Sequence, residues 1–308
     1  MTGSPRAVEV LDPGLTTLVQ DAGRPGWAHV GVGRSGAADV GAWRAANRAV
    51  GNDEDAAALE VLMGGLRLRA LAEVEVAVAG ARVAVTVDGA EPSPGAARQT
   101  GAATTLRLSV GNVLVLGRPE RGLRTYVAVR GGIDVPPVLG SRAGDRLGGI
   151  GPAPLAAGDV LPVGDAHTPR GDQLPDGSPP DDPALDDAVL RVEPGPHAHW
   201  FEPRWPGVLC APEGFVVAPS SDRVAVRLEG PPILRTPRAQ GRELAPIGLV
   251  PGAVQVPPDG RPVVFGVDHP VTGGYPVLAV VRSSDLDLLA QVRPGDVVRL
   301  ALALPRVR

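Results

Sequence analysis

The sequence predicts a mainly β protein with a few short helices, and three observations support this fold class. Of the 308 residues, 44% are hydrophobic but only 3% are aromatic, so the core must consist mainly of Val, Leu and Ala. Valines alternate with other residues in several stretches, which is the period of a strand. Turn-forming residues, drawn from 41 Gly and 34 Pro, separate nearly all of these stretches.

The alternation of apolar residues locates the strands. The first strong pattern runs from Leu66 to Val87, and the parity of its valines changes across Gly80-Ala81. This change predicts a hairpin that turns at those two residues. Further strands are expected at residues 104–116, 125–129, 224–228, 263–267 and 277–281.

Two segments have the spacing of a helix instead. The first covers residues 37–50, with Ser35 as its expected cap, and its inward stripe recurs three or four residues apart at Val40, Trp43, Asn47 and Val50. The second covers residues 285–292, with Ser284 as its expected cap. Glycine follows both segments, as is common where a helix ends.

A short pattern of Gly, then Asn or Asp, then Val occurs three times, beginning at Gly111, Gly158 and Gly295. Each copy predicts a tight turn ahead of an apolar strand. The last two copies each close a run of strands, as expected if two related β units end alike.

Residues 167–187, which follow the copy at Gly158, have a composition that cannot form a packed core. This stretch is rich in Pro and Asp and contains almost no large apolar residue. The sequence therefore predicts an N-terminal domain of residues 1–166, a linker of residues 167–188 and a C-terminal domain of residues 189–308.

Composition excludes several classes of function. The formal net charge of −4 argues against general nucleic-acid binding. All 30 basic residues are Arg, so this chain supplies no lysine for a Schiff base, a nucleotide loop or attached biotin. Cys210 is the single cysteine, which excludes an intrachain disulfide and a multi-cysteine zinc site. Because no apolar run approaches about 18 residues, we expect a cytoplasmic protein without membrane contact.

The densest cluster of polar residues and glycines lies between Gln20 and Asn52. Arg24 offers planar donors for a carboxylate or phosphate, and Asp39 offers an acceptor or a base. We therefore expect Arg24 and Asn47 to bind substrate and Asp39 to be catalytic. The alternative is that Asp39 and Asn47 only cap or bridge loops.

The segments of this cluster, with others downstream, resemble the KipA family, which is the family of the 5-oxoprolinase C component and is also known as allophanate hydrolase subunit 2 or the biotin-dependent carboxyltransferase family. The resemblance extends over almost the whole chain. It is carried by residues 11–15, 19–26, 35–39, 46–52, 59–60, 131–136, 139–142, 227–231, 250–257 and 268–276.

The resemblance implies a cyclophilin-like β-barrel in each of the two domains. It also implies work as one subunit of an ATP-dependent 5-oxoprolinase, which opens the cyclic amide of 5-oxoproline to give glutamate. The implied partners are a KipI-like B component and a third subunit, and we expect this chain to be inactive alone. The resemblance implies that the complex uses ATP. This chain contains no recognisable nucleotide-binding motif, so the sequence leaves open whether ATP binds here or on a partner subunit.

Two other activities remain open within the same family. The chain could be a carboxyltransferase subunit that receives the carboxyl group from biotin on a partner protein, with urea or a related amide as acceptor. It could also be a non-catalytic regulatory partner of a KipI-like protein. Neighbouring genes for a biotin carboxylase would favour carboxyl transfer.

The matching segments near the C-terminus predict the second half of the site. We expect Glu229 and His269 to be catalytic, with substrate-binding residues at Arg227, Gln255, Asp268, Thr272, Gly273, Gly274 and Tyr275. A structural ion pair between strands is the alternative for Arg227 and Glu229, and an ordinary loop histidine is the alternative for His269.

We expect no metal site. His197 and His199 would share one side of a strand, but no third ligand of matching spacing stands nearby.

Overall fold

The computed structural model describes residues 6–88, 98–99, 103–165 and 189–303. The chain divides into two compact units. Unit 1 comprises residues 1–24 and 35–182, and unit 2 comprises residues 25–34 and 183–308. The predicted linker of residues 167–188 lies outside the described residues, so that boundary stays a prediction.

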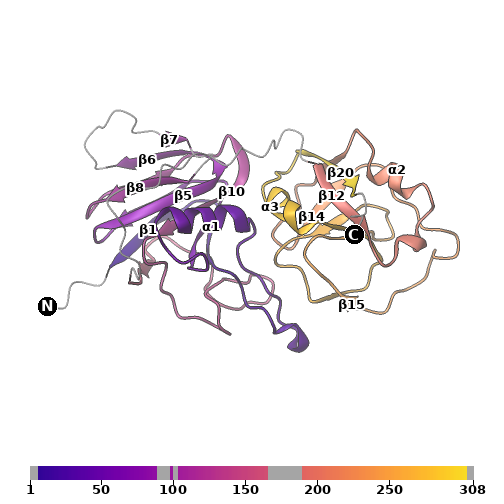
Figure 1. Ribbon diagram of the computed structural model, residues 1–308, viewed down its shortest axis with the longest axis horizontal. Coiled ribbons are helices and arrows are strands. Elements are labelled where there is room, and N and C mark those ends of the chain that lie inside the picture. Colours follow the sequence, from indigo (N-terminus) through magenta and orange to yellow (C-terminus); the bar gives the residue numbers. More distant parts are fainter. Residues whose placement is uncertain (1–5, 89–97, 100–102, 166–188, 304–308) are drawn as a thin grey trace, which may run out of the picture. The chain divides into compact units, whose positions relative to one another are not determined.

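Unit 1 contains two antiparallel sheets (Figure 1). The six-stranded sheet has the order β11-β1-β4-β9-β6-β7, formed by Val160–Pro162, Ala7–Pro13, Leu66–Ala70, Val113–Leu116, Ala84–Asp88 and Arg98–Gln99. The five-stranded sheet has the order β2-β3-β10-β5-β8, formed by Thr16–Gln20, Ala58–Leu62, Arg121–Val129, Val74–Arg82 and Thr104–Leu108.

The main core of unit 1 consists of aliphatic side chains from both sheets. Val8 and Leu68 come from the six-stranded sheet, and Leu59, Val76 and Val127 come from the five-stranded sheet; all five side chains are fully buried. The expected core of Val, Leu and Ala is therefore present, and burial of these side chains is the largest stabilising contribution.

The other side of the five-stranded sheet is covered by helix α1, Val40–Ala49 (Figure 1). Its residues Trp43 and Ala46 pack in a second cluster with alanines of the sheet and with Tyr126, and Asn47 is buried as well. The predicted inward stripe is confirmed at Trp43, Asn47 and Val50 but is wrong at Val40, which is exposed at the first turn of the helix. The predicted cap is wrong, because Ser35 lies four residues before Asp39, whose side chain accepts a hydrogen bond from Ala42 N.

The predicted hairpin at Gly80-Ala81 is also wrong. Strand β5 continues through both residues to Arg82, and β5 and β6 belong to different sheets. Val76, Val78 and Val85 nevertheless belong to one core. The parity of the valines changes because the chain crosses from one sheet to the other while it faces the same interior.

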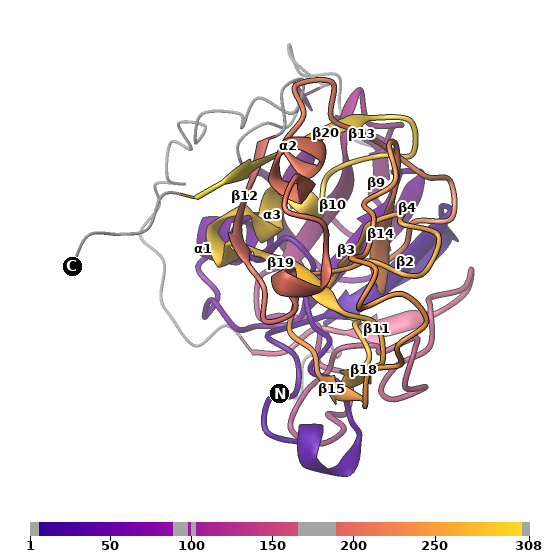
Figure 2. The same cartoon turned by 90° about the vertical axis from the view of Figure 1, so that its right-hand side faces the viewer.

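Unit 2 is a closed seven-stranded barrel, so the predicted mainly β fold is confirmed (Figure 2). The strand order is β12-β19-β16-β17-β14-β13-β20, formed by Val189–Pro194, Val277–Val281, Ala253–Gln255, Val263–Phe265, Ala225–Glu229, Phe215–Val217 and Val297–Leu302. Outside the barrel, β15 (Ile247–Gly248) pairs with β18 (Thr272–Gly273).

Short helices complete the described chain. They are η1 (Ala28–Val30), η3 (Ala198–Trp200), α2 (Trp205–Leu209), η4 (Ser283–Asp285) and α3 (Leu286–Leu289). The second predicted helix, residues 285–292, is shorter than expected, because α3 covers only Leu286–Leu289. The predicted cap is wrong, because Ser284 lies inside η4 and no side chain caps α3. None of the helices described here is long and apolar enough to span a bilayer.

The repeated Gly-Asx-Val pattern has one structure in all three places. Gly111, Gly158 and Gly295 have φ values of 88°, 92° and 91°, and β9, β11 and β20 each begin two residues later. In each copy the glycine N–H donates to the carbonyl of a residue on a neighbouring strand, and that residue's N–H donates back to the Asx carbonyl. The predicted turn before each strand is confirmed.

Candidate functional site

The polar residues singled out in unit 1 do not meet at one point. Asp39 caps α1, and its own N–H donates to the Tyr126 hydroxyl at 2.8 Å. Asn47 lies near the other end of the helix, where its Nδ2 donates to Ala56 O at 2.8 Å. Both side chains are buried, which agrees with the alternative that they cap and bridge structure. Their predicted roles in catalysis and substrate binding stay predictions.

A buried polar network surrounds Asp39. The Tyr126 hydroxyl donates to Glu60 Oε2 at 2.7 Å, and Arg124 Nε lies 3.4 Å from Glu60 Oε1. Burial, followed by the negative charges of Glu60 and Asp39, holds the pKa of the Tyr126 phenol well above its usual range. This network fixes the start of α1 against strands β3 and β10.

Arg24 is the most deeply buried of the predicted charged substrate ligands, with 1% of its surface exposed. One of its terminal nitrogens donates to the carbonyl of Ala143. Its Nε and its other terminal nitrogen are buried without a hydrogen-bond partner among the described residues. Nearby, Gln20 Nε2 donates to Gly144 O at 2.8 Å, while Gln20 Oε1 is likewise buried and unpaired within the described chain.

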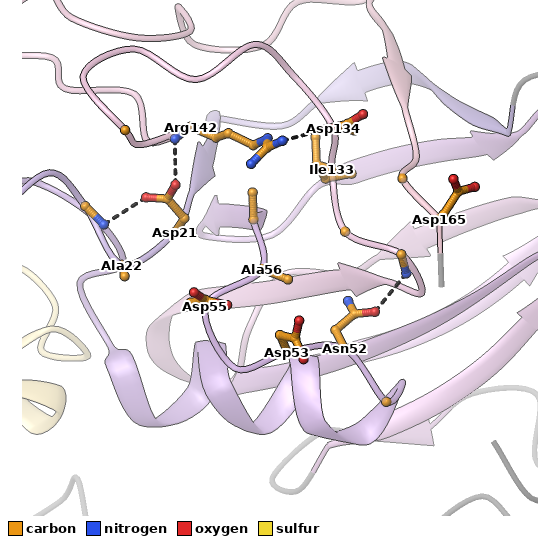
Figure 3. A pocket seen from close by; sticks show the side chains of 17 residues that line it. Asp21, Ala22, Asn52, Asp53, Asp55, Ala56, Ile133, Asp134, Arg142 and Asp165 are labelled. Carbon is orange, nitrogen blue, oxygen red and sulfur yellow. Dashed lines mark hydrogen bonds and ion pairs between the residues drawn. The ribbon is translucent and has the colours of Figure 1, made fainter. Parts of the chain in front are cut away.

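Unit 1 contains a cavity of about 470 Å³ that is built from motif segments far apart in sequence (Figure 3). Its lining includes Asp21 and Gly23, Gly51 and Asn52, Gly131 to Asp134, and Gly140 with Arg142. All of these lie inside the segments that carry the family resemblance. Four of the segments that carry the resemblance therefore meet at this cavity, although Arg24, Asp39 and Asn47 do not line it.

Side-chain hydrogen bonds hold the walls of this cavity in place (Figure 3). Asp21 accepts from Ser141 Oγ and from Arg142 N, both at 2.6 Å, and from Gly23 N at 2.8 Å. The Arg142 guanidinium reaches Asp134 at 2.6 Å. Asn52 Oδ1 accepts from Gly131 N at 2.8 Å. Three loops are thus fixed to one another by groups that line the cavity.

The cavity is strongly acidic. Its lining includes five aspartates and one arginine, Arg142. Arg142 pairs with Asp134, which leaves the exposed carboxylates of Asp53, Asp55 and Asp165 without a described cationic partner. An acidic cavity repels anions and accepts neutral or cationic groups. The sequence did not indicate Asp53, Asp55 or Asp165 as site residues. Four other lining residues, Asp21, Asn52, Asp134 and Arg142, lie in segments that carry the resemblance.

In unit 2, two predicted residues lie on the outer face of the barrel. Arg227 and Glu229 alternate with buried residues along β14, and both are exposed. Neither side chain forms an ion pair with a residue of another strand in the described part of the chain, so the alternative of a structural ion pair between strands finds no support. Their predicted roles remain open, because an exposed strand face presents both groups to solvent.

Asp268 and His269 are engaged locally. Both Asp268 oxygens accept from Arg223, at 2.7 and 3.1 Å, and both side chains are buried. His269 Nδ1 donates to Pro270 O at 2.8 Å. These contacts agree with the interpretation of His269 as a loop histidine, and they place Asp268 in a buried bidentate pair.

The remaining predicted residues come together at the loop that follows β18. Buried Gln255 donates from Nε2 to Tyr275 O at 2.8 Å. A Cβ at Gly273 would lie 2.8 Å from Gln255 Nε2, so a larger residue there would require the Gln255 side chain to shift. Thr272, Gly274 and Tyr275 are exposed, and the last two line a second cavity of about 730 Å³.

The structure also places the residues weighed as metal ligands. His197 accepts a hydrogen bond at Nδ1 from Val277 N, and burial, followed by the charge of His199, lowers the pKa of His197. Over residues 6–88, 103–165 and 189–303, no group of three His, Cys, Asp or Glu side chains is arranged to hold a metal ion.

Comparison with known proteins identifies the fold. A family model described as carboxyltransferase domain, subdomain A and B, matches residues 30–302. The chain is 36% identical over 302 residues to the C component of the 5-oxoprolinase of Escherichia coli, which covers 94% of this chain and 89% of that protein. It is 32% identical to urea amidolyase of Saccharomyces cerevisiae, with 96% of this chain but only 16% of that protein covered.

Solved structures agree with this result. TTHA0988 superposes with a TM-score of 0.82 at 36% identity, and the match covers 98% of this chain and 57% of that one. The urea amidolyase of K. lactis superposes with a TM-score of 0.86 at 30% identity, with 99% of this chain and 19% of that one covered. This chain thus spans little more than half of the first structure and about a fifth of the second. It belongs to the family of carboxyltransferase domains that comprise subdomains A and B.

Proposed function

We propose that this chain is the C component of a 5-oxoprolinase, a hydrolase complex that opens 5-oxoproline to glutamate. The observation that carries the proposal is the likeness to two proteins of that name, which match nearly end to end. The second, from Haemophilus influenzae, is 31% identical with 95% of this chain and 90% of that protein covered. In the urea amidolyases the matching region is a small part of a much longer protein.

The chemistry explains why such an enzyme needs more than one subunit. A lactam amide is a poor electrophile, and coupling to ATP can activate its oxygen before water attacks. Both ATP and 5-oxoproline are anions. The acidic cavity of unit 1 opposes their binding there, which supports placing the ATP site on a partner subunit.

The proposed partners are a KipI-like subunit and a third subunit. A chain that lacks a lysine and has an acidic cavity in unit 1 is poorly equipped to bind and orient a triphosphate alone. We therefore expect hydrolysis only in the assembled enzyme. The predicted catalytic residues Asp39, Glu229 and His269 remain proposals within that assembly.

Reconstitution tests the proposal. Glutamate release from 5-oxoproline is measured with ATP for the purified chain alone, for each pair of subunits and for the complete mixture. Activity that requires this chain, both partners and ATP is the expected result. An assembled, well-folded complex without activity would overturn the proposal.

Carboxyl transfer from biotin is the second candidate. It is favoured by the superposition on the urea amidolyase and urea carboxylase of Kluyveromyces lactis, both with a TM-score of 0.86. It predicts that this chain moves labelled carboxylate from a biotinylated carrier protein to urea or a related amide. The same preparation distinguishes the two activities, since only the first releases glutamate from 5-oxoproline.

A further inference from the structure

The cavity of unit 2 differs in charge from the acidic cavity of unit 1. Its volume of about 730 Å³ is in the usual range for small-molecule sites. Its charged lining residues are Arg235, Arg242 and Glu243, so the two arginines outnumber the single acid. A negatively charged ligand is therefore favoured in unit 2 and opposed in unit 1.

Arg235 is half-buried, and no carboxylate of the described residues forms an ion pair with it. Its two terminal nitrogens donate only to backbone carbonyls, at 3.5 Å to Arg242 O and at 3.3 Å to Val256 O. Its Nε is buried and has no hydrogen-bond partner within the described chain. A guanidinium carries five N–H donors, and the two long hydrogen bonds use one N–H on each terminal nitrogen. The charge of Arg235 is therefore held at the cavity without a described counter-ion.

Arg242 is held by a different kind of contact. Its guanidinium carbon lies 4.9 Å from the centre of the Trp200 ring, a cation–π arrangement that leaves the N–H groups at the edge of the guanidinium free to donate. The loop that carries Arg242 also provides the carbonyl that Arg235 contacts. The two cations are therefore coupled through one loop, residues 235–242.

The rest of the cavity suits the non-charged part of a small ring. Leu234, Leu244 and Pro258 give apolar wall, and exposed Tyr275 offers a hydroxyl that can donate or accept. Gln255 fixes the Tyr275 backbone from behind, as described above. The cavity thus combines two cations, one amphipathic ring and apolar wall, which matches an anionic group attached to a compact organic body.

We propose that this cavity is a binding site for a small organic carboxylate, in which Arg235 and Arg242 hold the carboxylate and Tyr275 contacts the ring. The class of ligand follows from the cavity alone. Its identification as 5-oxoproline rests on the proposed function, because that lactam carries one carboxylate on a five-membered ring. Arg227, which the sequence predicted to bind substrate, does not line this cavity.

Isothermal titration of the purified chain tests the site with two matched ligands. The first is 5-oxoproline, and the second is 2-pyrrolidinone, the same lactam without the carboxylate. We expect saturable binding of 5-oxoproline and binding of 2-pyrrolidinone that is weaker by about tenfold or more, because charge-assisted hydrogen bonds are lost.

Two arginine variants locate the site. Arg235→Gln should weaken 5-oxoproline binding by about tenfold or more, and Arg242→Gln provides the same test if the first variant does not fold. Arg261→Gln is the matched control, because Arg261 is an exposed arginine of the same unit that does not line the cavity. It removes the same charge and should leave the affinity unchanged.

The possible outcomes separate the site from the proposed function. The site would be overturned if Arg235→Gln, Arg242→Gln and Arg261→Gln bound 5-oxoproline with equal affinity. It would also be overturned if neither the chain nor an active complex bound 5-oxoproline saturably. Binding by the chain together with an inactive but assembled complex would overturn the proposed function and leave the carboxylate site standing. A complex that turns over with an unchanged KM in Arg235→Gln would overturn the site alone.

Discussion

Asp39 combines a structural contact with a predicted catalytic role, and two substitutions separate them. Its Oδ1 accepts from Ala42 N at 2.8 Å, which satisfies one of the free N–H groups at the start of α1. Asp39→Ala should lower the free energy of unfolding by about 1 kcal/mol, measured by urea denaturation. Asp39→Asn keeps an oxygen acceptor and should retain most of that stability.

The same pair of variants then decides whether Asp39 is a base. If it only caps α1, the Asn variant keeps the activity of the complex. If it accepts a proton in the reaction, the Asn variant loses activity while its denaturation curve stays close to that of the unmodified chain. Loss of stability in both variants would contradict the capping role, because Asn and Asp are comparable caps.

Tyr126 predicts how stability responds to alkaline pH. Burial, and then the charges of Glu60 and Asp39, raises the pKa of its phenol in the folded protein. A group whose pKa is raised by folding contributes its full stability below the pKa of the unfolded state, about 10 for tyrosine, and loses it as pH rises beyond that value. The free energy of unfolding should therefore fall above about pH 10.

Tyr126→Phe is the control for this pH effect. It removes the titrating hydroxyl and leaves Asp39 N without that acceptor, at a cost of about 1–3 kcal/mol near neutral pH. Its stability should then decline less steeply than that of the unmodified chain in urea titrations between about pH 8 and pH 11. Parallel declines in the two proteins would assign the alkaline loss to other groups.

At the scale of single elements, the spacing of apolar residues predicted which residues form a helix or a strand. It did not predict the position of a helix cap or the pairing of successive strands. The stripe of α1 follows from periodicity, and so does β19, which occupies residues 277–281 as expected. The cap of α1 and the turn at Gly80 were misplaced. Ser35 and Asp39 are both ordinary cap residues, and a change of valine parity accompanies either a hairpin or a crossing between sheets.

The repeated turn shows that a short pattern can specify a whole local structure. Besides the shared backbone hydrogen bonds, the Asx side chain accepts in every copy from the N–H three residues before it. Asn112 accepts from Ser109 at 2.9 Å, Asp159 from Ala156 at 2.8 Å and Asp296 from Arg293 at 2.7 Å. Because either Asn or Asp fills this position, the oxygen acceptor matters more than the charge.

This equivalence predicts the effect of substitutions in the second copy. Asp159→Asn should leave the free energy of unfolding nearly unchanged, as the first copy already has Asn112 at this position. Asp159→Ala should lower it by about 1 kcal/mol, because Ala156 N loses its acceptor. Urea denaturation of both variants measures the difference. Equal losses in the two would show that the negative charge, rather than the oxygen acceptor, is required.

At the scale of the whole molecule, the family motifs predicted a shared cavity better than the chemistry of single residues did. Four segments of unit 1 that carry the resemblance contribute to the unit 1 cavity, whereas Arg24, Asp39 and Asn47 do not line it. Side-chain chemistry alone does not reveal which polar groups are already paired, as Asp268 is with Arg223. The unit 2 cavity was only partly expected, because Arg235 and Arg242 fall outside every segment that the resemblance singled out.

The distribution of charge over the two cavities makes a prediction about ATP. The unit 1 cavity has five aspartates against one arginine, and the unit 2 cavity has two arginines against one glutamate. The first repels phosphates, and the second has one excess positive charge, which matches a monocarboxylate better than a triphosphate. The chain also lacks the lysine that commonly accompanies phosphates in nucleotide loops.

The isolated chain should therefore show no saturable binding of magnesium ATP in isothermal titration up to about 1 mM, the upper end of usual substrate affinities. The complex with both partner subunits should bind ATP under the same conditions, since the reaction needs it. Nor should ATP displace 5-oxoproline from the isolated chain, because the unit 2 cavity recognises one carboxylate. Micromolar binding of ATP to the chain alone would contradict the prediction that ATP binds a partner subunit. It would indicate that the lactam is activated on this chain.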